Sequence, residues 1–274
     1  MTALLEVRDL GKSYVVGDTT VRAVDGLSFR LEPGGSIGLV GESGSGKTTT
    51  ARMLVGLERP DSGEILVQGA PLDTRARGAA ARLARAKAVQ IVFQDPYLSL
   101  DPRVTVADGI DAVVALHSRL ARSARRRRTR ELLELVGLGE REAGAYPRRL
   151  SGGQRQRVAI ARALSVQPRV LVLDEAVSAL DVSVQAQVLN LLGDIRRDTG
   201  VGLVFVSHDL AVVRYVCDDV VVMHRGRAVE RGSTRSLLAA PQHPYTRLLL
   251  SSVPRPDWDL AAISRMRREA ALGD

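Results

Sequence analysis

Cysteine, aromatic residues and long apolar runs are all scarce in this 274-residue sequence. Cys217 is the only cysteine, which excludes an internal disulfide and a cysteine-ligated cluster. Aromatic residues make up 3% of the chain, too few for a platform that stacks nucleic-acid bases. No apolar run approaches the roughly 20 residues that span a bilayer, and the N-terminus lacks the basic-then-apolar pattern of a secretory signal. We therefore expect a cytosolic protein that needs a partner for any role at a membrane.

The charge is predominantly of one sign, with a formal net charge of +8. Such an excess can indicate nucleic-acid binding. However, Arg125–Arg128 lies in an Ala/Arg/Leu-rich stretch followed by Glu131 and Glu134, a pattern typical of a solvated helix face. We therefore expect a basic, solvated surface with weak attraction to anionic lipid and no nucleic-acid partner.

Apolar strand-like runs alternate with helical segments along most of the chain. The runs at Ser36–Val40, Val89–Phe93, Val170–Leu173 and Leu203–Val206 indicate buried strands of a parallel α/β sheet covered on both faces. The first thirty or so residues alternate between apolar and polar, which favours short antiparallel strands. From Thr105 to about Leu164 the spacing is helical, so this block resembles an insertion into the sheet.

A glycine-rich loop, GESGSGKT at Gly41–Thr48, fits the G-x-x-x-x-G-K-[ST] phosphate-loop pattern. A strand precedes it and a helix follows, as the pattern requires. The glycines let backbone N–H groups converge on phosphate oxygens, and the helix N-terminus adds the positive end of its dipole. Lys47 supplies a cation for the β- and γ-phosphates, and the Thr48 hydroxyl supplies a ligand for Mg²⁺. A turn that binds nothing would not explain a lysine and a threonine at these two positions.

Two acids follow the apolar run Val170–Leu173, in the Walker B arrangement. Strand ends of a parallel sheet open onto one edge, where ligands collect. Asp174 is therefore expected to hold Mg²⁺, directly or through water. Glu175 is placed to accept a proton from the attacking water. The alternative for Glu175, a solvated carboxylate at a strand end, fits poorly beside a phosphate loop.

Gln94 and His208 each follow another apolar run. A glutamine at a strand end carries no meaning by itself, and a lone histidine is more often structural than catalytic. His208 is nevertheless expected at the same sheet edge as Asp174, where its side chain can reach a γ-phosphate.

These motifs, together with LSGGQRQR at Leu150–Arg157, resemble the ATP-binding cassette (ABC) transporter ATPases over nearly the whole chain. The resemblance implies a P-loop NTPase (RecA-like) parallel-sheet core of the α/β class. It also implies an N-terminal antiparallel β subdomain and an inserted α-helical signature subdomain. The expected domains are an ATPase domain at 1–240, with the helical subdomain inserted at about 95–165, and a C-terminal extension at 241–274.

The resemblance also assigns roles to individual residues. Glu175 is the catalytic base, His208 the switch histidine and Gln94 the Q-loop glutamine, which touches Mg²⁺ or water. The cofactors are ATP and Mg²⁺, and the metal ligands are Thr48, Gln94 and Asp174. The ATP-binding residues are Tyr14, which stacks on adenine, and Gly41, Ser43, Gly44, Gly46, Lys47, Thr48 and Thr49.

The second glycine-rich stretch, Leu150–Arg157, is predicted to begin a helix. Ser151 is the expected N-cap of a helix that opens at Gly152 and runs through Leu164. In the family this motif lies far from the phosphate loop of its own chain. The resemblance therefore implies that two ATPase subunits close head to tail around two ATP molecules. The residues that contact ATP in trans are Ser151, Gly152, Gly153, Gln154 and Asp181.

Two further stretches of the sequence indicate a subfamily. FQDPYLSLDPR at Phe93–Arg103 and HPYTRLLLSSVP at His243–Pro254 are similar to the ATPases of oligopeptide and dipeptide importers, a group that also serves nickel, glutathione and some sugars. The implied partners are a second, sister ATPase subunit, two transmembrane permeases and an extracytoplasmic solute-binding protein. The implied location is peripheral, on the cytoplasmic face of the membrane. Two alternatives remain open: a soluble ABC ATPase acting on DNA or ribosomes, and an exporter ATPase.

Overall fold

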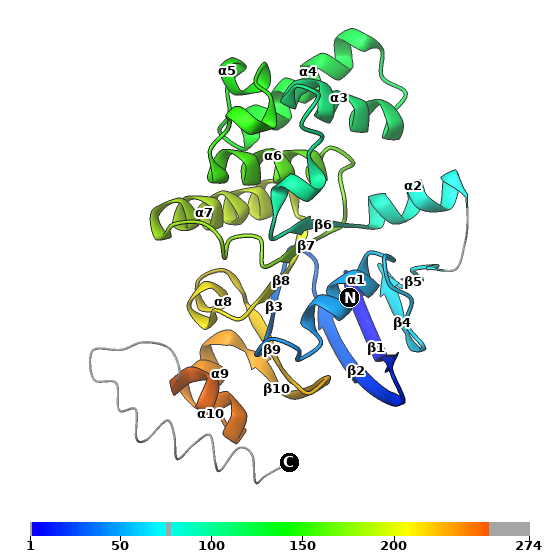
Figure 1. Ribbon diagram of the computed structural model, residues 1–274, viewed down its shortest axis with the longest axis vertical. Helices are drawn as coiled ribbons and strands as arrows, with labels where there is room; N and C mark the ends of the chain where they lie inside the picture. The colour runs from blue at the N-terminus through cyan, green and yellow to red at the C-terminus, as the bar shows by residue number, and fades with distance from the viewer. Residues whose placement is uncertain (1, 75–77, 252–274) are drawn as a thin grey trace.

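The computed structural model describes residues 2–74 and 78–251 (Figure 1). Its centre is a six-stranded sheet with the order β10-β9-β3-β8-β7-β6. The strands from β9 to β6 in this order run parallel, and β10 pairs antiparallel with β9. These strands are β3 (Ser36–Val40), β6 (Val89–Phe93), β7 (Val170–Asp174), β8 (Gly202–Ser207), β9 (Asp219–His224) and β10 (Arg227–Ser233).

Both faces of this sheet are buried, as the continuous apolar runs predict. Every residue of β3, β7 and β8 is buried. Along β7 the side chains alternate: Leu171 and Leu173 join one hydrophobic cluster, and Val170 and Val172 join another on the opposite face. The predicted parallel α/β core is therefore confirmed.

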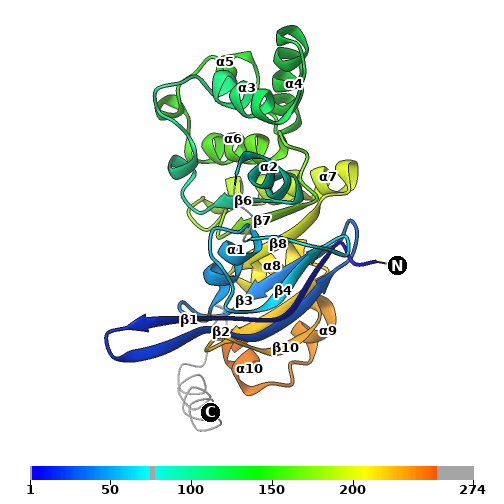
Figure 2. The same cartoon turned by 90° about the vertical axis from the view of Figure 1, so that its right-hand side faces the viewer.

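A second sheet is antiparallel, with the order β2-β1-β4-β5. It confirms the predicted antiparallel β subdomain, but its first two strands are long rather than short. They form a hairpin that extends from one side of the molecule (Figure 2). The strands are β1 (Leu5–Val16), β2 (Thr19–Leu31), β4 (Ser62–Val67) and β5 (Ala70–Pro71).

Helix α1 (Lys47–Leu54) lies between the two sheets. Its buried residues Ala51, Met53 and Leu54 share a hydrophobic cluster with side chains of both sheets, such as Leu27 of β2 and Val204 of β8. Helices that pack against the other face of the central sheet include α7 (Val182–Thr199), α8 (Leu210–Val216), α9 (Thr234–Ala239) and α10 (Pro244–Ser251). The short helix α1 is thus fixed on two sides, which positions the loop before it.

The helical insertion lies between β6 and β7. Its helices are α3 (Val106–His117), α4 (Arg122–Leu135), α5 (Glu140–Ala143) and α6 (Gly152–Leu164). They pack around buried side chains that include Ile110, Leu132 and Ile160. One further helix, α2 (Ala79–Ala88), precedes β6, and sequence reasoning missed it. None of the helices within the described ranges is both long and apolar enough to cross a bilayer.

Candidate nucleotide site

The loop from Gly41 to Gly46 joins β3 to α1, and its backbone requires glycine. Gly46 has φ 101° and is the N-cap of α1. A Cβ atom at Gly46 would lie 2.2 Å from the carbonyl oxygen of Ala23, and one at Gly41 would lie 2.2 Å from that of Met223. Ser43, Gly44 and Thr48 are exposed, whereas Thr49 is half-buried. The loop therefore presents backbone and hydroxyl groups to solvent at a helix N-terminus, which is an anion-binding arrangement.

Lys47 points into the loop rather than away from it. Its side chain is buried, and the Nζ donates to the carbonyl oxygens of Gly41 (2.8 Å) and Glu42 (2.7 Å) and to Ser45 Oγ (3.3 Å). Burial lowers the pKa of Lys47, although the nearby carboxylates of Glu175 and Asp174 oppose that shift. The ammonium group of Lys47 is thus held at the centre of the loop.

Asp174 and Thr48 come together across two elements. Thr48 Oγ1 at the start of α1 donates to Asp174 Oδ1 at the end of β7, over 3.4 Å. Burial raises the pKa of Asp174, and the neighbouring charge of Glu175 raises it further. A hydroxyl and a carboxylate oxygen are the hard ligands that Mg²⁺ prefers, so this pair fits the expected ion.

Glu175 adopts a backbone conformation that L-residues rarely take. Its φ is 49°, and its N–H donates to the carbonyl oxygen of Val206 (2.9 Å). Glu175 Oε1 lies 3.4 Å from His208 Nδ1, so the two predicted catalytic residues are in contact. Residues held in the left-handed region cluster at functional sites. The backbone turn directly after Asp174 separates the surroundings of the two adjacent acids.

Strand register places Gln94 at the same edge. Phe93 pairs with Asp174, and Asp174 pairs with Val206. Gln94 and Glu175, which follow Phe93 and Asp174, therefore leave the sheet side by side, next to Ser207 at the end of β8. Gln94 is exposed. Tyr14 is half-buried on β1, with Lys12 Nζ 5.4 Å from its ring centroid.

The second glycine-rich motif lies apart from the phosphate loop. Ser151 is the N-cap of α6: its Oγ accepts the N–H of Gln154 (3.2 Å), and Gln154 Oε1 accepts the N–H of Ser151 (2.9 Å). A Cβ atom at Gly153 would lie 2.3 Å from Val184 Cγ1, so glycine lets α6 approach α7 closely. Figures 1 and 2 both show α6 on the far side of β7 from α1.

Asp181 and Gly152 extend this second surface. Asp181 is the N-cap of α7, and its carboxylate accepts the N–H of Val184 (2.9 Å) and the hydroxyl of Ser183 (2.8 Å). A Cβ atom at Gly152 would lie 3.7 Å from Leu180, close to Asp181 in the chain. The residues predicted to act in trans are therefore neighbours of one another, separate from the cluster around Lys47.

Sequence reasoning missed one residue that contacts the loop. Tyr245 of α10 accepts the Glu42 N–H at its hydroxyl oxygen (2.9 Å). The HPY stretch served only as a subfamily marker, because no local pattern links two positions so far apart in the chain. The part of the C-terminal extension after Ser251 lies outside the described residues.

Comparison with family models gives two matches. Residues 24–178 match the ABC transporter family, and residues 229–271 match the oligopeptide/dipeptide transporter C-terminal region. A putative peptide import ATP-binding protein of Brucella ovis is 45% identical over 273 residues, covering 100% of this chain and 84% of that protein. The oligopeptide transport ATP-binding protein OppF of Bacillus subtilis is 45% identical, covering 93% of this chain and 84% of that protein.

Solved structures agree with the fold. An ATP-binding cassette in a dimeric, post-hydrolysis state bound to ADP and Pi superposes with a TM-score of 0.76 and 27% identity, covering 84% of this chain and 99% of that chain. The protein cbiO1 of Clostridium perfringens, part of an ABC transporter complex, gives a TM-score of 0.78 and 28% identity, covering 98% of this chain and 100% of that chain.

Proposed function

Because this chain belongs to the ABC transporter family, we propose that it drives the import of peptides. It is an ATPase cassette, an energy-coupling subunit of the kind that works with transmembrane permeases. The observation that carries the peptide assignment is the match of residues 229–271 to the oligopeptide/dipeptide transporter C-terminal region. Relatives named for peptide import and oligopeptide transport support it. Peptide is thus favoured over nickel, glutathione or sugar, and import over export.

The phosphate loop binds ATP in this proposal. Backbone N–H groups at the start of α1 receive the β- and γ-phosphates, and Lys47 adds its charge. Thr48, Asp174 and Gln94 hold Mg²⁺, which neutralises phosphate charge when it is bound. The remaining ATP-binding residues of the loop are Gly41, Ser43, Gly44, Gly46 and Thr49, and Tyr14 stacks on adenine.

Glu175 accepts the proton of the attacking water, and His208 keeps its carboxylate oriented. The 3.4 Å contact between His208 Nδ1 and Glu175 Oε1 supports this pairing. Phosphoryl transfer requires positioning and charge compensation rather than covalent catalysis, so one base beside a metal ion suffices. Gln94, at the same sheet edge, senses the occupied site and moves with the helical subdomain.

A second ATPase subunit completes the site. The surface formed by Ser151, Gly152, Gly153, Gln154 and Asp181 lies apart from the loop of its own chain, so it binds the ATP held by a partner cassette. The exposed Ser151 at the N-terminus of α6 offers a hydroxyl and unpaired N–H groups to a γ-phosphate. The partner in this proposal is a sister subunit in a heteromeric pair. ATP then forms part of the interface, and hydrolysis opens it.

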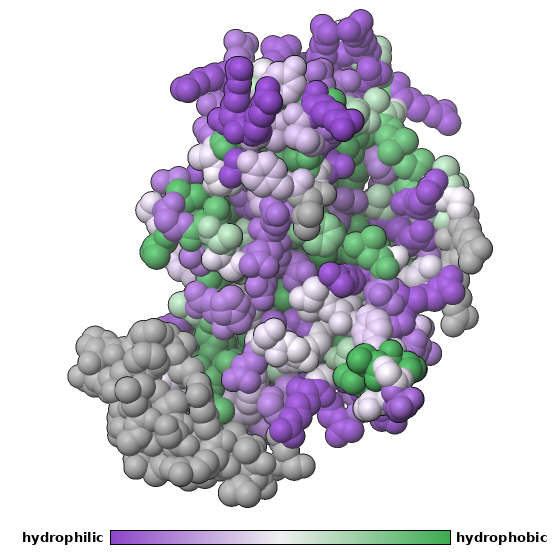
Figure 3. Space-filling view, viewed as in Figure 1, coloured by the Kyte–Doolittle hydropathy of each residue, from purple (hydrophilic) through white to green (hydrophobic). Residues whose placement is uncertain are grey.

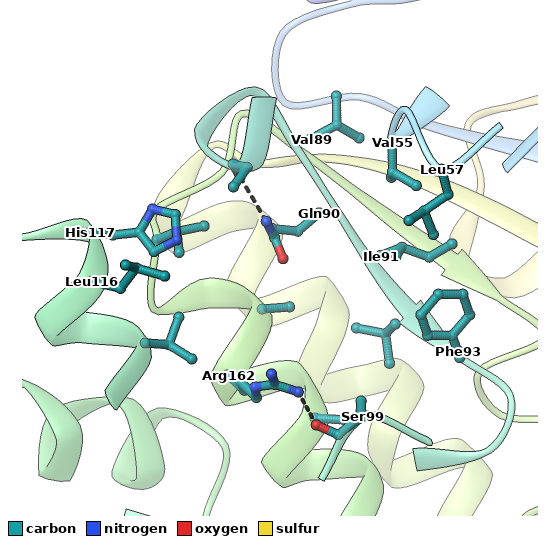
Figure 4. A pocket seen from close by; sticks show the side chains of 16 residues that line it. Val55, Leu57, Val89, Gln90, Ile91, Phe93, Ser99, Leu116, His117 and Arg162 are labelled. Carbon is teal, nitrogen blue, oxygen red and sulfur yellow. Dashed lines mark hydrogen bonds between the residues drawn. The ribbon is translucent and has the colours of Figure 1, made fainter. Parts of the chain in front are cut away.

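A groove between the helical insertion and the core suits a permease. It has a volume of about 450 Å³ and is lined largely by apolar side chains from the turn after α1 and from β6, α3 and α6, among them Leu57, Phe93 and Leu116 (Figure 4). Leu57 and Leu116 are 63% and 65% exposed. Exposed apolar side chains at a concave surface favour an apolar partner. We place here the cytoplasmic coupling helix of a permease, next to Gln94.

The proposal also includes the domain boundaries and the location of the protein. Residues 1–240 form the ATPase domain with its helical insertion at about 95–165, and 241–274 form the importer-type extension. The protein lies at the cytoplasmic face of the membrane, and a solute-binding protein delivers substrate on the other side. Figure 3 shows hydrophilic side chains over most of one face of the helical insertion, in keeping with a solvated surface.

Uptake of labelled di- and oligopeptides by cells that lack this protein tests the proposal. The wild-type chain should restore uptake, and Glu175→Gln should not. Purified Glu175→Gln should bind ATP yet hydrolyse it about 10²- to 10⁴-fold more slowly, because the base is lost. Near-wild-type phosphate release would remove Glu175 from this role. Restoration of nickel or glutathione uptake, without peptide uptake, would overturn the peptide assignment.

A further inference from the structure

Helix α10 reaches back from the end of the described chain to the phosphate loop. Tyr245, the second residue of α10, is buried, with 3% of its surface exposed. Its hydroxyl oxygen accepts the backbone N–H of Glu42 over 2.9 Å. A phenylalanine would fill the same apolar space, but it would leave this N–H without its partner. The contact therefore explains why a hydroxyl is present at this buried position.

The start of α10 is firmly held. The carboxylate of Glu230 on β10 accepts the N–H groups of Gln242 (2.9 Å) and His243 (3.0 Å). His243 Nδ1 in turn accepts the N–H of Tyr245 (3.2 Å). The Tyr245 ring lies against the ring of His224 at the end of β9, with 4.0 Å between centroids. The hydroxyl is thus placed by the central sheet and not by a mobile side chain.

Tyr245 and Lys47 hold opposite ends of one peptide unit. The Gly41 carbonyl oxygen accepts Lys47 Nζ (2.8 Å), and the N–H of the same peptide, that of Glu42, donates to Tyr245 (2.9 Å). Lys47 cannot keep all of its loop acceptors and also contact a phosphate, since an ammonium group has only three donors. If the Gly41 carbonyl is the acceptor that Lys47 gives up, the Gly41–Glu42 peptide loses its contact at the oxygen. The bond to Tyr245 remains.

We propose that Tyr245 is a positioning residue of the nucleotide site: it keeps the Gly41–Glu42 peptide oriented while Lys47 exchanges loop carbonyls for phosphate. This inference rests on the proposed use of the loop as the ATP site. It makes α10 part of the nucleotide site rather than an appendage to the fold. The expected consequence is a dependence of nucleotide affinity on one hydroxyl group that touches no nucleotide.

Tyr245→Phe in the full chain tests the inference, because it removes the hydroxyl and keeps the ring. Loss of one hydrogen bond should weaken ATP and ADP binding and raise the KM for ATP by about three- to tenfold, with kcat unchanged. The matched control is Tyr215→Phe on α8, where the hydroxyl donates to Asn190 instead. Affinity is measured by nucleotide titration, and the thermal midpoint of each variant is recorded in parallel.

The outcomes separate clearly. A raised KM in Tyr245→Phe but not in Tyr215→Phe supports the inference. Affinity equal to wild type, with or without a lower thermal midpoint, would mean that the ring merely packs, and the inference falls while the proposed function stands. If the wild-type chain binds no ATP, both fall. Hydrogen exchange at the Glu42 amide of the ADP-bound wild-type chain needs no variant: slow exchange supports the contact, and exchange as fast as that of an exposed amide overturns it.

Discussion

The two glycine-rich regions of this molecule are built in contrasting ways. Around the phosphate loop, polar groups from α1, β7 and β8 already converge: Lys47 is buried in the loop, and Thr48 reaches Asp174. At the start of α6, Ser151 is exposed and its hydroxyl accepts the N–H of Gln154 within its own helix. The first region is assembled within one chain. The second presents a helix N-terminus to the outside.

Glycine is required in the two regions for different structural reasons. Gly46 is required by a left-handed backbone and by the carbonyl of Ala23. Gly153 is required by the close approach of Val184, so it serves the packing of α6 on α7. The loop is shaped for a ligand, and the second motif is shaped to bring a helix end to a surface. The following experiments test whether the loop binds the ligand and whether the second motif acts at an interface.

The largest effect is expected from Ser151→Arg. A bulky cation at the exposed N-terminus of α6 blocks a partner's nucleotide, so hydrolysis should fall to background while ATP binding by the single chain is unchanged. Phosphate release and equilibrium ATP binding are measured on the same preparation. Ser233→Arg is the matched control, because Ser233 is likewise an exposed N-cap serine, accepting the N–H of Ser236 at the start of α9.

Loss of both binding and hydrolysis in Ser151→Arg would indicate a folding defect rather than a blocked interface. Hydrolysis at the wild-type rate would contradict the role in trans. Loss of a cap costs about 1 kcal/mol, so Ser233→Arg should be slightly less stable but active.

Lys47→Ala should have the next largest effect. The ammonium group is the only side-chain cation in the loop, and hydrogen bonds made by charged groups contribute about 1.5–3 kcal/mol, so ATP affinity should fall about ten- to a hundredfold. Titration with a fluorescent ATP analogue measures this. Lys87→Ala on the exposed face of α2 serves as the control and should bind ATP like wild type. Unchanged affinity in Lys47→Ala would count against the phosphate-loop assignment.

Tyr14→Ala should have the smallest effect. Stacking of an aromatic ring adds about 0.5–1.5 kcal/mol, so affinity for ATP should fall about two- to tenfold. Tyr14→Phe keeps the ring and should bind ATP normally, which distinguishes stacking from a role of the hydroxyl. Equal affinity in both variants would remove Tyr14 from the adenine site and leave it as a strand residue on β1.

Much of this arrangement was predictable because parallel strands share an edge. The apolar runs of β3, β6, β7 and β8 identify the strands, and the residue after each run then marks the edge. That reasoning places His208 at the same edge as Asp174, and in the structure His208 contacts Glu175, the residue after Asp174. The N-cap role of Ser151 followed equally well from local hydrogen-bonding chemistry.

Other features lacked a readable signal. Helix α2 has no buried residue, and Leu83 is its only apolar side chain larger than alanine, so its sequence carries a weak signal. Strand β9 carries the apolar run Val220–Met223, but that run does not lead into a motif. The left-handed backbone of Glu175 is imposed by its surroundings rather than by its residue type. The bond from Glu42 to Tyr245 joins positions 203 residues apart, and only the folded chain brings them together.

The close approaches around the phosphate loop have a practical consequence. Carbonyl groups of Ala23 on β2 and Met223 on β9 leave no room for a Cβ atom at Gly46 and Gly41. These strands belong to different sheets. The sheets are joined by a hydrogen bond from the N–H of Asp25 on β2 to the carbonyl of Gly226, in the turn between β9 and β10 (2.9 Å). The conformation of Gly41–Thr48 therefore depends on β2 and β9 as well as on its own sequence. We expect that these eight residues, transferred to another protein without both strands, would not keep this conformation.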